Sequence, residues 1–97
     1  MPHPDVFWSE VARLGRAGAP ALVMDLHRPE SSERAREIVE TYSADEPEVL
    51  KRDFFHSLCA AFTLAEVRSQ LARAGLDRLR CEMVSDRHWV AWGQLPS

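Results

Sequence analysis

Hydrophobic positions recur at helical spacing near the start of the chain. Phe7, Val11 and Leu14 lie three or four residues apart, and Asp5 precedes them at a place where a side chain can cap a helix. Two glycines follow within four residues of Leu14 and provide a stop. The pattern predicts a first helix over residues 5–14.

The next hydrophobic run is continuous instead of periodic. Residues 21–24 are Ala-Leu-Val-Met, which is typical of a strand covered on both faces, as in a parallel sheet between helices. Pro29 follows shortly after and cannot continue a strand ladder. We therefore expect one buried, interior strand over residues 21–26. If one of its apolar edges lacks a neighbour, that edge invites pairing with another chain.

Two helices are expected in the middle of the chain. Ser31 or Ser32 can cap the first, which turns one stripe of side chains inward: Ala35, Ile38, Val39 and Tyr42. Asp45 and Glu48 form a capping pair around Pro47 for the second helix, whose inward face holds Leu50, Phe54 and Leu58.

The last third of the chain predicts a fourth helix and a hairpin. Thr63 and Glu66 have the spacing of a capping box, and Gly75 is placed to end the helix in the left-handed conformation. Two short strand-like segments, 79–83 and 89–92, then flank a polar turn. The chain thus predicts an α/β fold with about four helices, one buried strand and a C-terminal hairpin, the three strands forming a mixed sheet.

Length and charge narrow the possible functions. The chain has 97 residues, with 12 Lys and Arg against 15 Asp and Glu, and a formal net charge of -3. Proteins that bind a phosphate backbone carry an excess of basic residues, whereas this chain has an excess of acidic ones. We therefore expect no nucleic-acid partner. The length fits a single domain over residues 1–97. Because no apolar run is long enough to span a bilayer and no leader pattern begins the chain, we expect a cytoplasmic protein without a membrane partner.

No metal site is expected either. Cys59 and Cys81 do not form a C-x-x-C pair, and we expect both to be reduced and buried. The four histidines have none of the i, i+4 or H-x-E spacings of a metal site; they are His3, His27, His56 and His88.

Polar residues that follow the strands are the candidates for a ligand site. In open parallel sheets, ligands bind outside the carboxyl ends of the strands. That rule selects Asp25, His27 and Arg28 after the first strand. It also selects the hairpin turn, provided that the first strand of the hairpin runs parallel to residues 21–26; this turn holds Ser85, Asp86, Arg87 and His88.

A further candidate group lies on the helix after Pro47. It consists of Arg52, Asp53 and His56, and the last two share a face at i, i+3 spacing. A plain structural role competes for every candidate, because turn histidines are often surface residues and arginines often pair with nearby carboxylates at little energetic consequence. No residue is assigned a catalytic role, and the tryptophans are interpreted as packing residues: Trp8, Trp89 and Trp92.

Four segments in this order resemble the class I S-adenosylmethionine-dependent methyltransferases. They are Pro-Asp-Val-Phe-Trp at 4–8, Val-Met-Asp-Leu at 23–26 with Arg28 and Pro29, Glu-Pro-Glu-Val-Leu at 46–50 with Arg-Asp-Phe at 52–54, and Ser-Asp-Arg-His at 85–88 before Trp92 and Gly93. The resemblance implies part of a Rossmann-like, seven-stranded sheet. In it, residues 21–26 are similar to the fifth strand and the hairpin to the sixth and seventh, the last being antiparallel.

By this resemblance the first four strands of the family would be missing. Residues 1–4, Met-Pro-His-Pro, resemble the end of the loop after the fourth strand, so we expect Met1 to be an internal residue of a longer protein. The chain has no G-x-G-x-x-G or G-x-G pattern, so we expect it to bind no cofactor alone. The resemblance implies a truncated, acceptor-side fragment in which some of the candidate residues face the methyl acceptor.

Two other interpretations stay open. One is a non-catalytic interaction module that dimerises through the edge of the strand over residues 21–26. The other is an unrelated small enzyme or ligand-binding domain that uses the His and Arg cluster. We expect either a homo-oligomer or a complex with a complementing N-terminal methyltransferase half. A likeness of fold does not establish enzymatic activity.

Overall fold

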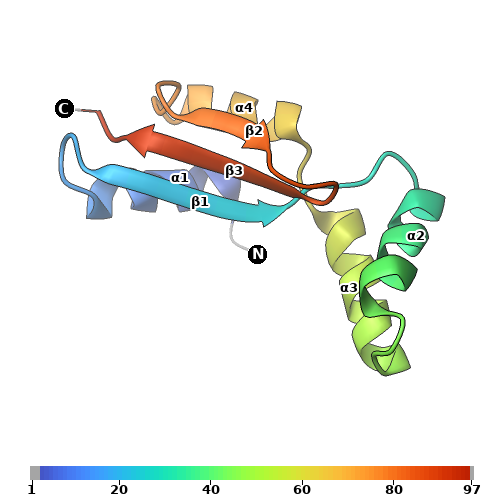
Figure 1. The fold of residues 1–97 in the computed structure, drawn as a ribbon. Helices are drawn as coiled ribbons and strands as arrows, with labels where there is room; N and C mark the ends of the chain where they lie inside the picture. Colours follow the sequence, from blue (N-terminus) through green and yellow to red (C-terminus); the bar gives the residue numbers. More distant parts are fainter. Residues whose placement is uncertain (1–2, 97) are drawn as a thin grey trace.

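Residues 3–96 are described in a computed structural model of the chain (Figure 1). This part consists of four helices and three strands, which confirms the predicted number and order of elements. In chain order they are α1 (Pro4–Leu14), β1 (Pro20–Leu26), α2 (Ser32–Ser43), α3 (Glu48–Ala60), α4 (Leu64–Arg73), β2 (Arg80–Met83) and β3 (His88–Gln94).

The three strands form one sheet in the order β1-β3-β2. β3 is the central strand and pairs antiparallel with β1, from Pro20 opposite Gln94 to Leu26 opposite His88. It also pairs antiparallel with β2, which confirms the predicted hairpin. The prediction of a mixed sheet is wrong, because both neighbouring pairs are antiparallel. β1 and β2 nevertheless point in the same direction, since each runs opposite to β3.

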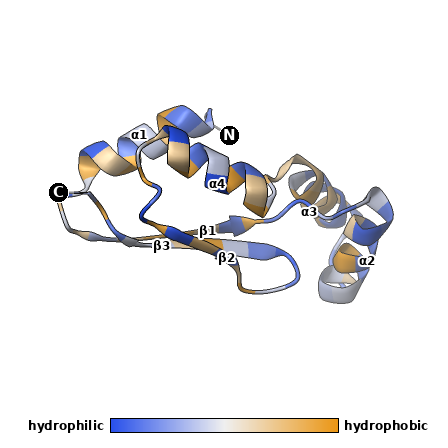
Figure 2. Cartoon of the chain, turned by 90° about the horizontal axis from the view of Figure 1, so that it is seen from above, coloured by the Kyte–Doolittle hydropathy of each residue, from blue (hydrophilic) through white to orange (hydrophobic). Residues whose placement is uncertain are grey.

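Helices α1 and α4 cover one face of this sheet (Figure 2). Side chains alternate between the two faces along a strand, so Trp89 and Ala91 of β3 point toward the helices and are buried. The core between helices and sheet consists of Trp8, Val67, Leu71, Leu76, Leu79, Cys81, Trp89, Ala91 and Leu95.

β1 is not the interior strand that its continuous apolar run predicts. In the described residues it lies at the edge of the sheet and pairs with β3 alone. Ala21 and Val23 pack against the core, whereas Leu22 and Met24 are 73% and 58% exposed on the opposite face. A continuous apolar run is compatible with two arrangements. Both faces of the strand can be buried, or one face can be buried while the other is apolar and open.

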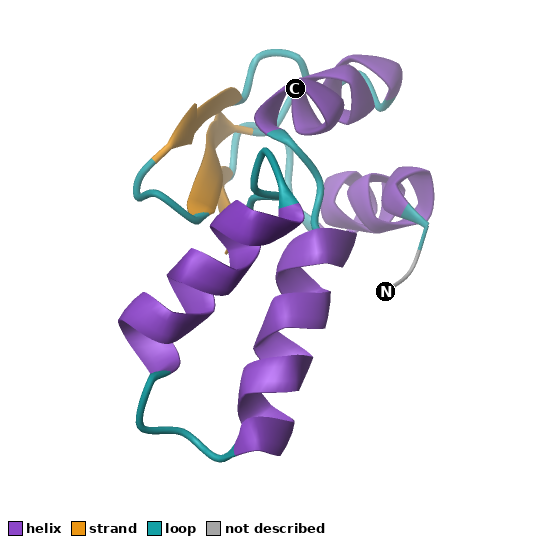
Figure 3. Ribbon diagram, turned by 90° about the vertical axis from the view of Figure 1, so that its right-hand side faces the viewer, coloured by secondary structure: helices purple, strands orange, loops and turns teal. Residues whose placement is uncertain are grey.

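Helices α2 and α3 form a helical hairpin that projects from one end of the sheet (Figures 1 and 3). It has a small core of its own, to which Leu26 at the end of β1 also contributes; the buried members are Ala35, Ile38, Val39 and Leu58. The described part of the molecule is therefore elongated, with extents of 46 × 20 × 19 Å.

Two helix starts and one helix end match the local sequence. The Ser31 hydroxyl accepts a hydrogen bond from the backbone N–H of Arg34 and caps α2. Thr63 and Glu66 form both bonds of the predicted capping box at α4. Gly75 follows α4 with a φ of 72°, the left-handed conformation expected of it.

The other two helix starts differ from the predictions. His3, and not Asp5, precedes α1, and its side chain accepts from the backbone N–H of Asp5. Pro47 precedes α3 without a side-chain cap, so the capping pair predicted for Asp45 and Glu48 does not form. A proline ring presets the backbone at this point, so α3 begins there without a capping side chain.

Several side chains expected to be buried are exposed. Tyr42 and Leu50, which belong to the helical hairpin, are 47% and 49% exposed. Cys59 is also exposed, whereas Cys81 is buried as expected. The reason is the position of the helical hairpin, which projects from the end of the sheet, so the described elements cover these side chains only in part.

Candidate functional site

The end of β1 and the turn between β2 and β3 lie next to each other. The backbone N–H of His27 donates to the backbone carbonyl of Arg87 at 2.8 Å, and Leu26 pairs with His88. Because β1 and β2 point the same way, the polar residues that follow each strand gather at one end of the sheet. We call this group, with Asp25, His27, Arg28 and residues 85–88, the strand-end cluster.

Arg28 ties the strand-end cluster to the start of α4. Its guanidinium lies 3.2 Å from the Glu66 carboxylate and also donates to the carbonyl of Ala61 at 3.4 Å. The pKa of Glu66 is lowered, first by the backbone N–H of Thr63 and further by Arg28. The positive charge of Arg28 is thus paired, which favours a structural role for it.

The surroundings of His27 change the pKa of its side chain. Partial burial lowers the pKa of its imidazole, and the charge of neighbouring Arg28 lowers it further. His27 is therefore neutral at neutral pH and has a lone pair available to accept a hydrogen bond. This is the state that a proton acceptor requires.

Asp86 and Arg87 contact α2 and are engaged with each other. Asp86 accepts a hydrogen bond from the Tyr42 hydroxyl at 2.9 Å and one from Arg87 at 3.0 Å, and Arg34 lies 3.6 Å away. The Arg87 guanidinium carbon lies 3.6 Å from the centre of the Tyr42 ring. The hydrogen bond from Tyr42 and the two guanidinium groups hold the pKa of Asp86 below its usual value. These groups attach the hairpin turn to α2.

Ser85 and His88 form a hydrogen-bonded pair within the turn. The Ser85 hydroxyl accepts from the backbone N–H of Arg87 at 3.2 Å and lies 3.0 Å from Nδ1 of His88. Which of the two atoms donates depends on the tautomer of the His88 ring. A nucleophile–base pair needs a third group that orients the base. None contacts His88 in the hydrogen bonds of residues 3–96, so the pair fits a turn better than a catalytic site.

The candidates on α3 are separate from the strand-end cluster. Arg52 faces a groove of the helical hairpin beside Lys51 and Arg36, and Asp53 and His56 are exposed. Within the described residues, no hydrogen bond or ion pair joins Asp53 to His56, or any of the three to the strand-end cluster. Their shared helical face therefore does not make a site.

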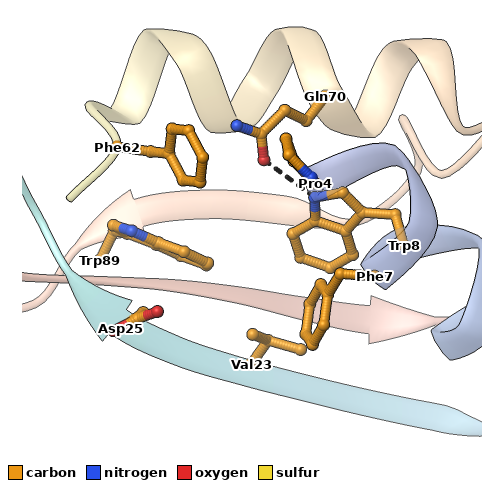
Figure 4. Close-up of a pocket in the computed structure, with 8 residues that line it drawn as sticks. All are labelled: Pro4, Phe7, Trp8, Val23, Asp25, Phe62, Gln70 and Trp89. Carbon is orange, nitrogen blue, oxygen red and sulfur yellow. Dashed lines mark hydrogen bonds between the residues drawn. The ribbon is translucent and has the colours of Figure 1, made fainter. Parts of the chain in front are cut away.

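Two cavities meet at the end of β1. The smaller, of about 60 Å³, lies between the sheet, α1 and α4 (Figure 4) and is lined by Pro4, Phe7, Trp8, Val23, Asp25, Phe62, Gln70 and Trp89. The larger, of about 290 Å³, lies toward the end of α3 and is lined by Asp25, Leu26, Ser57, Ala60, Ala61, Phe62 and Trp89. Asp25, Phe62 and Trp89 belong to both.

The sequence analysis assigns none of the aromatic residues around these cavities to a site. Gln70 is buried, and its side-chain oxygen accepts a hydrogen bond from the indole nitrogen of Trp8 at 3.0 Å (Figure 4). A polar residue beside Val67 and Leu71 on the inward stripe of α4 is the feature that could have revealed it. The indole nitrogen of Trp89 is buried, and no group in the part of the chain that the structure describes forms a hydrogen bond with it.

The described residues contain neither a metal site nor a membrane-spanning helix. Across residues 3–96, no three His, Cys, Asp or Glu side chains gather as a metal site would require. Nor does this part of the chain contain a helix that is long and apolar enough to cross a membrane. In comparisons with family models, curated proteins and solved structures, nothing matches the chain.

Proposed function

We propose that this chain is the acceptor-side part of an S-adenosylmethionine-dependent methyltransferase. In this proposal it contributes three strands of a larger Rossmann-like sheet, and a cofactor-binding half completes that sheet. The observation that supports the proposal best is the open side of the sheet, which consists of the free edge of β1 and the apolar face opposite α1 and α4.

The open face is apolar where β1 and β3 pair, and Arg80 and Glu82 of β2 add charged side chains on its other side. Leu22 pairs with Trp92 and Met24 pairs with Val90 across the two strands, and all four point away from the helices. Fully burying a leucine or methionine side chain stabilises a protein by about 1.5–3 kcal/mol, so leaving this face in water forgoes several kcal/mol. Such a patch marks a surface that another element covers.

The free edge of β1 also lacks the usual protection of edge strands. Natural edges carry charged residues, prolines or bulges that prevent pairing. Residues 21–24 carry no charge, and proline stands only at the first position of the strand, Pro20. This edge is suited to pairing with a further strand, as the fifth strand of a methyltransferase sheet would require.

Strand directions and the position of the polar residues agree with the same proposal. The last strand runs antiparallel to both others, as the resemblance implies for a seventh strand. The carboxyl ends of β1 and β2 lie at one end of the sheet, which is where α/β sheets bind their ligands. The strand-end cluster would then face the methyl acceptor.

In this role the chain positions the methyl acceptor and excludes water from the place of reaction. Methyl transfer proceeds by in-line attack of the acceptor on the activated methyl group, and holding the two reactants in that geometry supplies most of the rate. Neutral His27 can accept a hydrogen bond from an acceptor group. Arg28 and Glu66 hold the end of β1 in place by their ion pair.

Calorimetric titration of the purified chain with S-adenosylmethionine, together with its mass in solution, tests this proposal. We expect no saturable heat, because the glycine-rich turn that binds the cofactor is absent from these residues. Saturable binding would contradict the proposal that another segment supplies the cofactor site. An unrelated small ligand-binding domain would be favoured by that result.

A dimerising interaction module is a second candidate, and the uncharged stretch of the β1 edge over residues 21–24 favours it. Two copies that pair through β1 would form one six-stranded sheet and satisfy the backbone groups of both edges. A stable, folded dimer without affinity for S-adenosylmethionine favours the module. A folded monomer argues against it and leaves the edge for a different chain.

A further inference from the structure

The smaller cavity has mostly aromatic walls. Four aromatic rings surround it, from Phe7, Trp8, Phe62 and Trp89, which come from α1, the loop before α4, and β3 (Figure 4). Phe7 and Trp8 meet edge to face at 5.0 Å, and Trp8 and Trp89 are tilted by 43° at 6.4 Å. An edge-to-face contact covers one face of one of the two rings, and the tilted pair Trp8 and Trp89 is not stacked, so the ring surfaces that line the cavity remain open to a guest.

Among the described residues, Asp25 is the only charged side chain that lines either cavity, and it is exposed to solvent. Its Oδ1 accepts a hydrogen bond from the backbone N–H of Leu26 at 2.7 Å. Among the described residues, no lysine, arginine or histidine forms an ion pair with it. An unpaired carboxylate beside aromatic faces attracts cations and repels anions, because the ring faces are also electrostatically negative.

Trp89 adds a hydrogen-bond donor to this arrangement. Its side chain lines both cavities, only 3% of the residue is exposed, and its indole N–H has no partner among residues 3–96. A buried donor without a partner is costly, and such groups are rare in proteins. An acceptor atom on a bound molecule would satisfy it.

We infer that this pair of cavities binds an organic cation, an alkylammonium head that carries a nearby hydroxyl or ether oxygen. The ammonium group lies among the four rings, Asp25 balances its charge, and the oxygen accepts from the indole N–H of Trp89. The inference stands on these side chains alone and does not depend on the proposed function.

The cavity sizes agree with such a ligand. One water molecule needs about 10–15 Å³ measured in this way, so the smaller cavity of about 60 Å³ has room for a nitrogen with its methyl groups. The adjoining cavity of about 290 Å³ accepts the remainder of the molecule. Choline, a quaternary ammonium alcohol, is therefore the probe of choice, and its uncharged isostere, in which carbon replaces the nitrogen, is the matched control.

Nuclear magnetic resonance of the tryptophan indole N–H groups tests the inference on the unmodified chain. The three tryptophans give three signals. We expect choline to shift the signals of Trp8 and Trp89 in a saturable manner and to leave that of Trp92, on the open face of the sheet, unchanged. The uncharged isostere should bind at least about tenfold more weakly, because it lacks the cation–π and carboxylate attraction.

Asp25→Asn provides the second test, since it removes the charge and keeps the shape and the acceptor oxygen. We expect roughly tenfold weaker choline binding in this variant, and no change in the matched variant Asp53→Asn on α3. Equal binding of choline and its isostere would show an apolar cavity without cation selectivity and overturn the inference. Absence of any saturable shift, or undiminished binding in folded Asp25→Asn, would overturn it as well.

Discussion

Single side chains connect the two parts of this elongated molecule, and Tyr42 is the clearest case. It is exposed on α2, yet its hydroxyl donates to Asp86 in the hairpin turn at 2.9 Å. This hydrogen bond is the main reason that the pKa of Tyr42 is raised above 10.0. Because the phenolate form cannot donate, the bond favours the neutral phenol.

Replacing Asp86 should therefore be visible in the titration of this tyrosine. We expect Asp86→Ala to lower the pKa of Tyr42 toward 10.0, since the acceptor is removed while Arg87 remains. The chain has a single tyrosine, so ultraviolet absorbance of the phenolate reports on Tyr42 alone. Asp77→Ala, at an exposed position outside this contact, is the control. An unchanged titration in Asp86→Ala would mean that α2 and the hairpin turn are not in contact in solution.

His27 makes stability depend on pH in a defined window. Its pKa in the folded chain is lower than the value of 6.5 expected when unfolded, so the unfolded chain binds the proton first as pH falls. Its contribution is complete above 6.5 and is lost as pH falls from 6.5 through the lower folded pKa. We expect His27→Gln to reduce the pH dependence of the free energy of unfolding between about pH 7.5 and about pH 5, measured by urea unfolding. Identical pH profiles for both chains would contradict the burial of His27.

Residues whose role depends on their immediate neighbours in sequence are the ones that could be predicted. Ser31 as a cap and Gly75 as a helix stop follow from local backbone geometry. The contacts of Gln70 and Tyr42 could not be predicted, because the partners of their side chains are Trp8 and Asp86, which are distant in sequence. Such roles depend on which distant elements bury the side chain, and helical spacing alone does not show which elements these are.

At the scale of elements, the start of α4 is the best-defined local structure in the chain. The Thr63 hydroxyl accepts from the backbone N–H of Glu66, and the Glu66 carboxylate accepts from the backbone N–H of Thr63. We expect Thr63→Ala to lower the free energy of unfolding by about 1 kcal/mol. Thr63→Ser keeps the hydroxyl and should remain close to the original chain in the same urea titration. Equal losses in both variants would contradict the capping role.

Helices could be predicted from the sequence better than the sheet. Periodicity locates all four helices, because one apolar stripe on each contacts a neighbour. The continuous run in β1 does not reveal which of its faces is covered, so the exposure of Leu22 and Met24 could not be predicted from it. The antiparallel direction of the last strand is implied only by the family resemblance, and the prediction of a mixed sheet is wrong. The strand-end cluster could be located in outline, since strand ends gather polar residues. The aromatic cavity could not, because its rings come from three segments that are far apart in the sequence.

At the scale of the whole molecule, the two faces of β1 have different roles. One face packs against the core and contributes to stability, and the other is open and available for assembly. Val23 packs toward the core and Met24 points to the open face, although they are adjacent in the chain. A lysine at either position therefore has a different consequence. At position 23 its charge is placed among apolar side chains, and at position 24 it stays in water beside the free edge.

We expect Val23→Lys to lower the free energy of unfolding by about 1–3 kcal/mol, measured by urea unfolding. Met24→Lys should stay within about 0.5 kcal/mol of the original chain but weaken any self-association, measured by sedimentation, because edge lysines oppose strand pairing. If Val23→Lys left both stability and assembly unchanged, the strand would not be built as described. If Met24→Lys left an oligomer intact, assembly would use another surface, and the open side of the sheet would remain available for a complementing half.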